Sequence, residues 1–173
     1  MEVCNVKIHT YTSDLKALTI YISSAPIKKR KPSFCVLYIG KFVYSIYYKG
    51  YINISGIHNI DTIEVPIQLL AHVSKIDKKQ FKPPVIDNIT AVYNSPYKKS
   101  VLLPIPLIKK LLENNNIIKV KYNREKFPGI FSSTGKGTII WFATYKIVIV
   151  GAKSKEDLNF NENVIKFILQ DKE

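Results

Sequence analysis

The feature that most constrains the fold is an order of secondary-structure elements that occurs twice along the chain. In the C-terminal half, runs of β-branched and aromatic residues alternate with glycine-containing turns between residues 127 and 153. Such runs predict an antiparallel meander of strands. Residues 155–170 then space their apolar side chains three and four apart, which predicts an amphipathic helix covering one face of the sheet. This pattern indicates an α+β fold.

The remaining expected elements follow the same order in both halves. Ahead of the C-terminal meander we expect a strand at 86–93, a helix that opens at Pro104 or Pro106 and stops at 114–116, and then a connecting strand. In the N-terminal half we expect a strand at 3–11, a helix at 14–22 with Ser13 as candidate N-cap, strands at 33–38, 42–48 and 51–55, and a closing helix at 61–73. Residues 74–84, with four lysines and two prolines, are expected to be a linker. The chain is therefore predicted to contain two repeats, 1–83 and 84–173.

Landmark residues can be compared between the halves by their spacing. Asn5, Phe34, Tyr47 and Gly56 stand 29, 13 and 9 residues apart, whereas Asn88, Phe127, Phe142 and Gly151 stand 39, 15 and 9 apart. The last interval is the same in both halves. We assign the other differences to ten extra residues in a connection and two in a hairpin turn.

Charge points to a polyanionic partner. The chain carries 26 Lys and Arg against 13 Asp and Glu, a formal net charge of +13, and Arg30 and Arg124 are its two arginines. Lysine offers a point charge to phosphates, whereas bidentate recognition of guanine favours arginine. The balance indicates nucleic acid bound mainly through its backbone. The lysine excess also fits the AT-rich codons of Ile, Lys, Asn and Tyr.

Other functional classes lack their sequence signatures. Cys4 and Cys35 stand 31 residues apart and the three histidines share no metal-ligand spacing, so no metal or cofactor is expected. Phosphate-binding glycine loops, a nucleophile elbow and paired catalytic carboxylates are not found in the sequence. No apolar run approaches the roughly 18 residues of a membrane span. We therefore expect a protein that is not an enzyme and has no membrane partner.

The most specific residue pattern lies in the C-terminal half. It comprises residues 87–90 (Asp-Asn-Ile-Thr), 125–130 (Glu-Lys-Phe-Pro-Gly-Ile) and 138–153, which ends Val-Ile-Val-Gly-Ala-Lys. This part of the chain resembles the TATA-box-binding protein (TBP) family, whose pattern joins an FPG segment, a strand that ends in Phe, and a V-x-T-G-A-K strand. The N-terminal half is similar mostly in layout.

The resemblance implies a saddle of two pseudo-symmetric repeats, with a curved antiparallel sheet and helices on its convex face. In this family the concave face lies on the DNA minor groove, where aromatic wedges unstack base steps and kink the duplex. Because TA steps deform most easily, TATA-like elements are favoured. The implied wedges are Phe34 and Tyr47 in the first repeat and Phe127 and Phe142 in the second. Without the resemblance, packing within the sheet is the simpler interpretation of an aromatic residue on a strand.

The resemblance also implies polar and apolar contacts on the same face. Asn5 and Asn88 match asparagines that donate to minor-groove acceptors, although a bulge or turn contact is the alternative interpretation of Asn in a strand. Apolar side chains would line the same surface: Pro128, Ile140, Val148 and Val150. Basic residues ahead of the wedges would reach phosphates: Lys28, Lys29, Arg30 and Lys31 in the first repeat, and Lys121, Arg124 and Lys126 in the second. A solvated basic loop or a nuclear-localisation-like run is the alternative for residues 28–31.

The N-terminal half departs from the family pattern at comparable positions. Asn53 and Ser55 stand where the family has Val and Thr, which makes the first repeat more polar and leaves its preference for TATA open. Val150 stands where the second repeat of the family has Thr. Residues 123–126 (Asn-Arg-Glu-Lys) replace an acidic segment, so docking of a standard TFIIB-like factor is also open.

The implied function is that of a general transcription initiation factor. Such a protein would bind AT-rich promoter DNA as a monomer, bend it, and act with a TFIIB-like factor and the RNA polymerase machinery. The alternatives are an architectural DNA-binding protein with little sequence selectivity and an adaptor that contacts only proteins. The divergent first repeat, the minimal length and the AT-rich composition suggest a viral or parasitic source, with action in the nucleus or at a cytoplasmic viral replication site.

Overall fold

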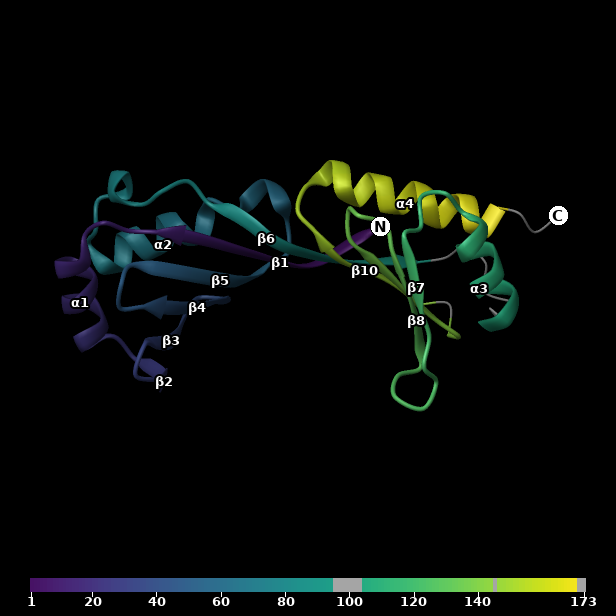
Figure 1. Ribbon diagram of the computed structural model, residues 1–173. Coiled ribbons are helices and arrows are strands. Elements are labelled where there is room, and N and C mark those ends of the chain that lie inside the picture. The colour runs from purple at the N-terminus through teal and green to yellow at the C-terminus, as the bar shows by residue number, and fades with distance from the viewer. Residues whose placement is uncertain (95–103, 145, 171–173) are drawn as a thin grey trace. The chain divides into compact units, whose positions relative to one another are not determined.

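Secondary-structure elements occur in the same order in two units of the chain (Figure 1). The computed structural model describes residues 1–94, 104–144 and 146–170. The N-terminal unit comprises Asn5–Asp87, and the C-terminal unit comprises Asn88–Glu173 together with Met1–Cys4. Strands of the N-terminal unit pair in the order β2-β3-β4-β5-β1, and those of the C-terminal unit in the order β6-β10-β9-β8-β7. Every strand pair within a unit is antiparallel.

The N-terminal unit follows the predicted order with one additional strand. Its elements are β1 (Glu2–Tyr11), α1 (Leu15–Ser24), β2 (Ile27–Arg30), β3 (Phe34–Ile39), β4 (Phe42–Tyr47), β5 (Tyr51–Ile57) and α2 (Val65–Ser74). The short strand β2 was not predicted, because its three exposed cations conceal the strand pattern. Ser13 is not the N-cap of α1. Asp14 Oδ1 accepts the Ala17 N–H at 3.0 Å, while the Ser13 hydroxyl lies 2.7 Å from Gln80 Oε1.

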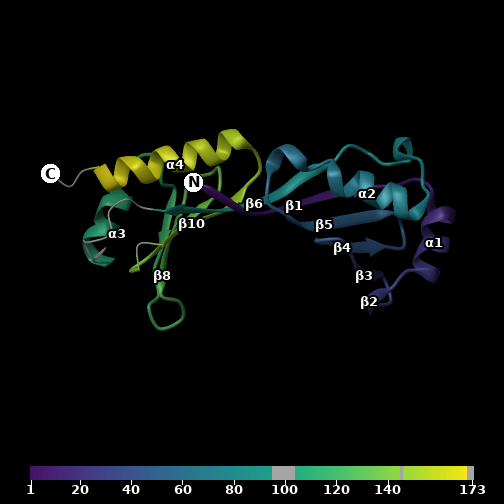
Figure 2. The same cartoon turned by 180° about the vertical axis from the view of Figure 1, so that it is seen from behind.

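The C-terminal unit also follows the predicted order. Its elements are β6 (Val85–Asn94), α3 (Pro104–Glu113), β7 (Lys119–Lys121), β8 (Gly129–Ser133), β9 (Thr138–Phe142), β10 (Lys146–Ala152) and α4 (Lys155–Gln170). Helix α4 has the predicted bounds and lies along the sheet of its unit (Figure 2). Its first turn is capped because Ser154 Oγ accepts the Asp157 N–H at 3.1 Å. None of the described helices is long and apolar enough to cross a lipid bilayer.

Side chains alternate between two unlike faces in each sheet. On one face Tyr44 is buried beneath α2, where its hydroxyl donates to the Pro66 carbonyl at 2.8 Å, and burial raises the pKa of this phenol. In the C-terminal unit Trp141 is equally buried, and α4 packs against β10. Residues at the intervening strand positions are mostly only half-buried. We call this second face of each sheet its open face.

The predicted linker, residues 74–84, connects α2 to β6. It packs on the N-terminal unit, because Phe81 is buried and the Lys82 N–H donates to the Tyr11 carbonyl at 2.8 Å. The predicted lengthening of a hairpin turn by two residues is wrong, because four residues lie between the Cα partners Tyr38 and Val43 and four lie between Ser133 and Thr138. The two extra residues of the C-terminal half therefore precede β8.

The buried bond between Trp141 and Ser132 yields a stability prediction. The indole N–H donates to Ser132 Oγ at 2.8 Å, and the serine is 0% exposed. Ser132→Ala leaves this donor without an acceptor and should lower the free energy of unfolding by about 1–3 kcal/mol. Urea denaturation followed by fluorescence of the single tryptophan measures the change. Ser133→Ala, on the open face, is the control and should cost less than about 0.5 kcal/mol; equal losses would contradict the assignment.

Candidate nucleic-acid interface

Strand register builds two equivalent rows of side chains, one on the open face of each unit. The N-terminal row consists of successive Cα partners across β2, β3, β4, β5 and β1: Lys29, Val36, Ser45, Asn53 and His9. The C-terminal row crosses β7, β8, β9, β10 and β6 in the same way: Lys121, Phe131, Ile140, Val148 and Val92. Each row starts with a lysine on the outer strand of its unit. The rows therefore match position by position, which allows the two faces to be compared directly.

The N-terminal unit brings its two predicted wedge residues together. Phe34 begins β3 and Tyr47 ends β4, and they are direct Cα partners with ring centroids 5.1 Å apart. Tyr51 continues the cluster, 5.6 Å from Tyr47 and 5.1 Å from His9. Desolvation, and then the nearby Asp87 carboxylate, raise the pKa of Tyr51. The result is a half-exposed aromatic cluster at one end of the open face.

Gly50 makes the position of this cluster possible. It adopts φ +90° in the turn between β4 and β5, where its N–H donates to the Tyr47 carbonyl at 2.9 Å. A Cβ at this position would lie 2.4 Å from the Thr12 carbonyl oxygen, so only glycine fits.

The C-terminal unit also brings its predicted wedges together, by a different backbone route. The rings of Phe127 and Phe142 lie 5.6 Å apart, and Phe127 is 37% exposed. The Cα partner of Phe142, however, is Gly129. Phe127 lies two residues ahead of β8, in a turn where its N–H donates to the Asn123 carbonyl at 2.9 Å. Its ring covers Gly129, where a Cβ would come within 2.7 Å of the ring. Phe127 therefore occupies in space the place that Phe34 reaches from its own strand.

The two asparagines make the same contact in the two units. Asn5 Oδ1 accepts the Gly56 N–H at 3.0 Å, and Asn88 Oδ1 accepts the Gly151 N–H at 2.6 Å. Both glycines adopt positive φ, +88° and +82°, beside irregularities in strand register. The alternative interpretation, a bulge contact, is thus correct for the side-chain carbonyls. Because the glycine N–H requires an acceptor, this hydrogen bond also fixes the orientation of each asparagine amide. The carbonyl oxygen faces the glycine, and the NH₂ group is turned away from it.

The predicted phosphate contacts are dispersed around these faces. In the N-terminal unit Lys29 shares the open face with Val36, whereas Arg30 donates to the Ile22 carbonyl of α1 at 3.4 Å and Lys28 to the Tyr38 hydroxyl at 3.3 Å. Lys31 is exposed just before β3. In the C-terminal unit Lys121 shares the open face with Phe131.

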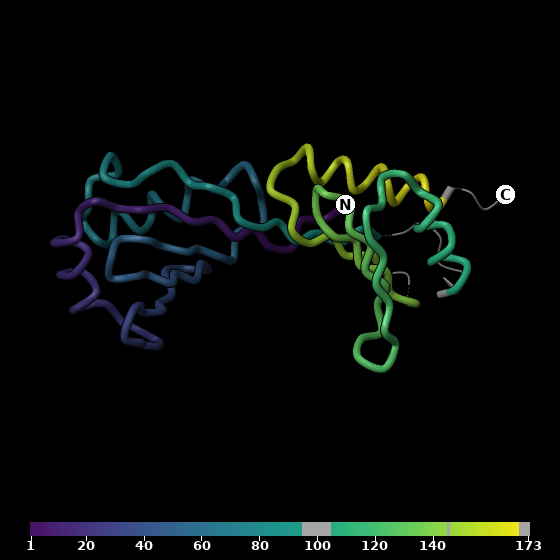
Figure 3. Tube along the Cα trace, viewed as in Figure 1, coloured from purple at the N-terminus to yellow at the C-terminus, as the bar shows by residue number. Residues whose placement is uncertain are grey.

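The loop between β7 and β8 carries the other cations. Arg124, Lys126 and the neighbouring Pro128 are exposed on this loop, which projects from the sheet of its unit (Figure 3). Val150 is half-buried on the open face opposite Thr138. Sequence reasoning missed His9 and Tyr51, because nothing in the local pattern indicates that they extend the aromatic cluster.

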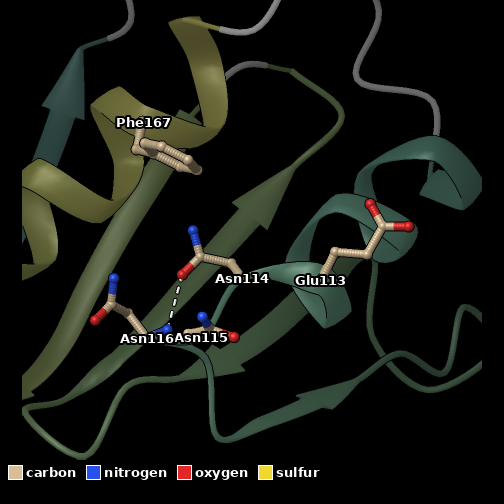
Figure 4. Close-up of a pocket in the computed structure, with 5 residues that line it drawn as sticks. All are labelled: Glu113, Asn114, Asn115, Asn116 and Phe167. Carbon is tan, nitrogen blue, oxygen red and sulfur yellow. Dashed lines mark hydrogen bonds between the residues drawn. The ribbon is translucent and has the colours of Figure 1, made fainter.

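A shallow depression of about 190 Å³ in the C-terminal unit lies apart from these rows. Glu113, three asparagines and Phe167 line it, between the end of α3 and helix α4 (Figure 4). Its only drawn hydrogen bond joins the Asn116 N–H to Asn114 Oδ1 at 2.9 Å. Among the described residues no three His, Cys, Asp or Glu side chains are placed to hold a metal ion. The residues that line this depression are not among the predicted site residues.

Comparison with known proteins supports the fold. No family model and no curated protein matches the sequence. Among solved structures, the chain is similar to Methanococcus jannaschii TBP, with a TM-score of 0.73 and 19% identity, covering 98% of this chain and 97% of that chain. A heterotetrameric sarcosine oxidase from Corynebacterium sp. U-96 aligns over 98% of this chain and 80% of that chain, at 10% identity, and its TM-score of 0.29 is too low to indicate a common fold. The chain has the TBP-like α+β fold, as predicted.

The asparagine contact yields a second stability prediction. Asn5→Ala removes the acceptor of the Gly56 N–H and should lower the free energy of unfolding by about 0.5–1.5 kcal/mol. Asn5→Asp keeps the acceptor while it removes the amide donor, so it should cost clearly less. Urea denaturation of both variants measures the difference. If aspartate destabilises the unit as much as alanine, the carbonyl bond is not the interaction that matters at this position.

Proposed function

We propose that this chain is a TBP-like transcription initiation factor that binds the minor groove of TATA-like, AT-rich promoter DNA and bends it. The observation that carries the proposal is the aromatic pair on the open face of each unit, Phe34 with Tyr47 and Phe127 with Phe142. Large rings on a face that none of the described helices of their unit covers are suited to a flat, apolar ligand such as a base step. The likeness to Methanococcus jannaschii TBP supports this proposal through the fold.

The proposed mechanism is partial intercalation from the minor groove. Each pair would enter one base step, at a cost of a few kcal/mol for unstacking, which wider contact with the bent duplex offsets. Pyrimidine–purine steps such as TA are the easiest to open, so part of the selectivity would come from DNA flexibility. Tyr47 and Phe142 end equivalent strands, and each would enter its step beside its partner ring.

The other open-face residues would determine register and base preference. Ile140, Val148 and Val150 form an apolar surface that fits A·T pairs, whereas the 2-amino group of guanine would lose its water there without a new acceptor. The amide groups of Asn5 and Asn88 would donate to adenine N3 or thymine O2. Lys29 and Lys121, on the outer strands, would contact phosphates and contribute affinity that falls with salt.

A TFIIB-like factor and the RNA polymerase machinery are the proposed protein partners. The loop that carries Arg124 and Lys126 is basic where the TBP family is acidic, so a partner that docks there would offer acidic residues. A second candidate function, an architectural protein without sequence selectivity, is favoured by the polar character of the N-terminal row. Equal affinity for TATA-containing and GC duplexes at matched salt would support that candidate over the first.

The aromatic pairs provide the test of this function. Phe127→Ala combined with Phe142→Ala should abolish or strongly reduce the bend in a TATA-containing duplex, because the rings that unstack the step are removed. Fluorescence energy transfer between dyes at the two duplex ends measures the bend. Phe167→Ala removes an exposed ring from α4 of the same unit and should leave the bend unchanged. A full bend in the double variant would show that these rings serve only packing.

A further inference from the structure

The two open faces differ most in the middle of their equivalent rows. We infer that the chain recognises two unlike half-sites: A·T pairs under the C-terminal unit, and a half-site under the N-terminal unit in which a G·C pair is accepted through its minor-groove 2-amino group. The inference rests on the proposed minor-groove binding, and it adds that the DNA site is asymmetric.

Register makes the comparison residue by residue. Ser45 and Asn53 are Cα partners on β4 and β5, and their equivalents on β9 and β10 are Ile140 and Val148. At the next pair on the same face, Ser55 stands opposite Val43, where the C-terminal unit has Val150 opposite Thr138. Three central positions are thus polar in one unit and aliphatic in the other.

The polar side chains of the N-terminal row are available to a ligand. In the part of the chain that the structure describes, no side-chain hydrogen bond engages Ser45, Asn53 or Ser55, and all three are half-buried on the open face. Asparagine is disfavoured in the middle of a strand. The Asn53 side chain makes no hydrogen bond within the described structure that would offset this loss of strand propensity. Its amide oxygen and nitrogen are therefore available to water or to a bound molecule.

His9 adds an acceptor at the end of the same row. Its Nδ1 lies 2.7 Å from Asp87 Oδ1, and because an ionised carboxylate only accepts, Nδ1 carries the proton. In the neutral ring Nε2 is then an acceptor. The face of the ring is held against Tyr51, at 5.1 Å between centroids. The equivalent residue of the C-terminal row is Val92, which offers no acceptor.

Minor-groove chemistry converts this difference into base preference. A·T pairs present only acceptors in this groove, whereas a G·C pair adds the 2-amino donor of guanine. Above Ile140 and Val148 that donor would be buried without a partner. Above Ser45 and Asn53 it can donate to a hydroxyl or to a side-chain carbonyl. The Ser45 hydroxyl and the Asn53 NH₂ group can instead donate to adenine N3 and thymine O2, so the N-terminal unit would tolerate both pairs. The unequal halves would then set the direction of the protein on its site.

The experiment compares guanine with inosine, which lacks only the 2-amino group. A duplex of A·T pairs with TA steps receives a single G·C or I·C pair at each position in turn, and the affinity of the full chain is measured for each. In one half of the site G·C should weaken binding about tenfold, and I·C should restore it. In the other half G·C should bind as tightly as I·C or tighter.

Reciprocal variants assign the halves to the units. Asn53→Val with Ser45→Ile copies the C-terminal row and should impose the tenfold penalty for G·C on the tolerant half alone. Val148→Asn should relax discrimination in the other half alone. Strand propensity favours the first variant, so it is expected to fold, and the inosine comparison on the unchanged protein does not depend on any variant.

The outcomes separate this inference from the proposed function. If the chain binds and bends the A·T duplex but rejects guanine equally in both halves, the inference is wrong and minor-groove binding stands. Equal acceptance of guanine in both halves also overturns it. If the chain neither binds nor bends any duplex, the proposed function itself fails.

Discussion

The whole arrangement depends on each sheet burying only one of its two faces. Side chains alternate along a strand, so a residue anchored beneath a helix places its neighbours on the opposite face. Tyr44 and Trp141 occupy equivalent strands and are fully buried on the helix side. Tyr47, three residues after Tyr44, therefore lies on the open face. Phe142, one residue after Trp141, lies on the open face of the other unit. A shift of one residue in register would bury these rings and expose the core, which is why the core determines the site.

Register is also what relates the two units at the level of single residues. Hairpins of equal length keep Ser45 with Asn53 in one unit and Ile140 with Val148 in the other. Matching bonds from Asn5 to Gly56 and from Asn88 to Gly151 fix the first strand of each unit against the last strand of its meander. Because the backbones agree this closely, the chemical differences between the rows come from the side chains and not from a change in strand pairing.

Much of the fold could be predicted from the sequence, and parts of the site could not. Local sequence patterns predicted the meanders and α4: runs of β-branched residues indicated the strands, and the apolar spacing of residues 155–170 indicated the helix. The resemblance to the TBP family also predicted the two aromatic pairs, Phe34 with Tyr47 and Phe127 with Phe142. Phe127 was less predictable, because its ring reaches the site from a turn over Gly129 and only tertiary packing reveals that. For the same reason the contact of Arg30 with α1, and the packing of Phe81 against the end of β1, have no local signal.

The central claim is that the open-face aromatic pairs enter base steps from the minor groove. The most direct measurement is the crystal structure of the full chain bound to a duplex that contains TA steps. The account predicts that the rings of Phe34 with Tyr47, and of Phe127 with Phe142, lie between unstacked base pairs at two steps, with the duplex bent toward the major groove. A complex in which the DNA lies on the helix-covered side, or in which it remains straight while the four rings stay packed on the sheet, would contradict it.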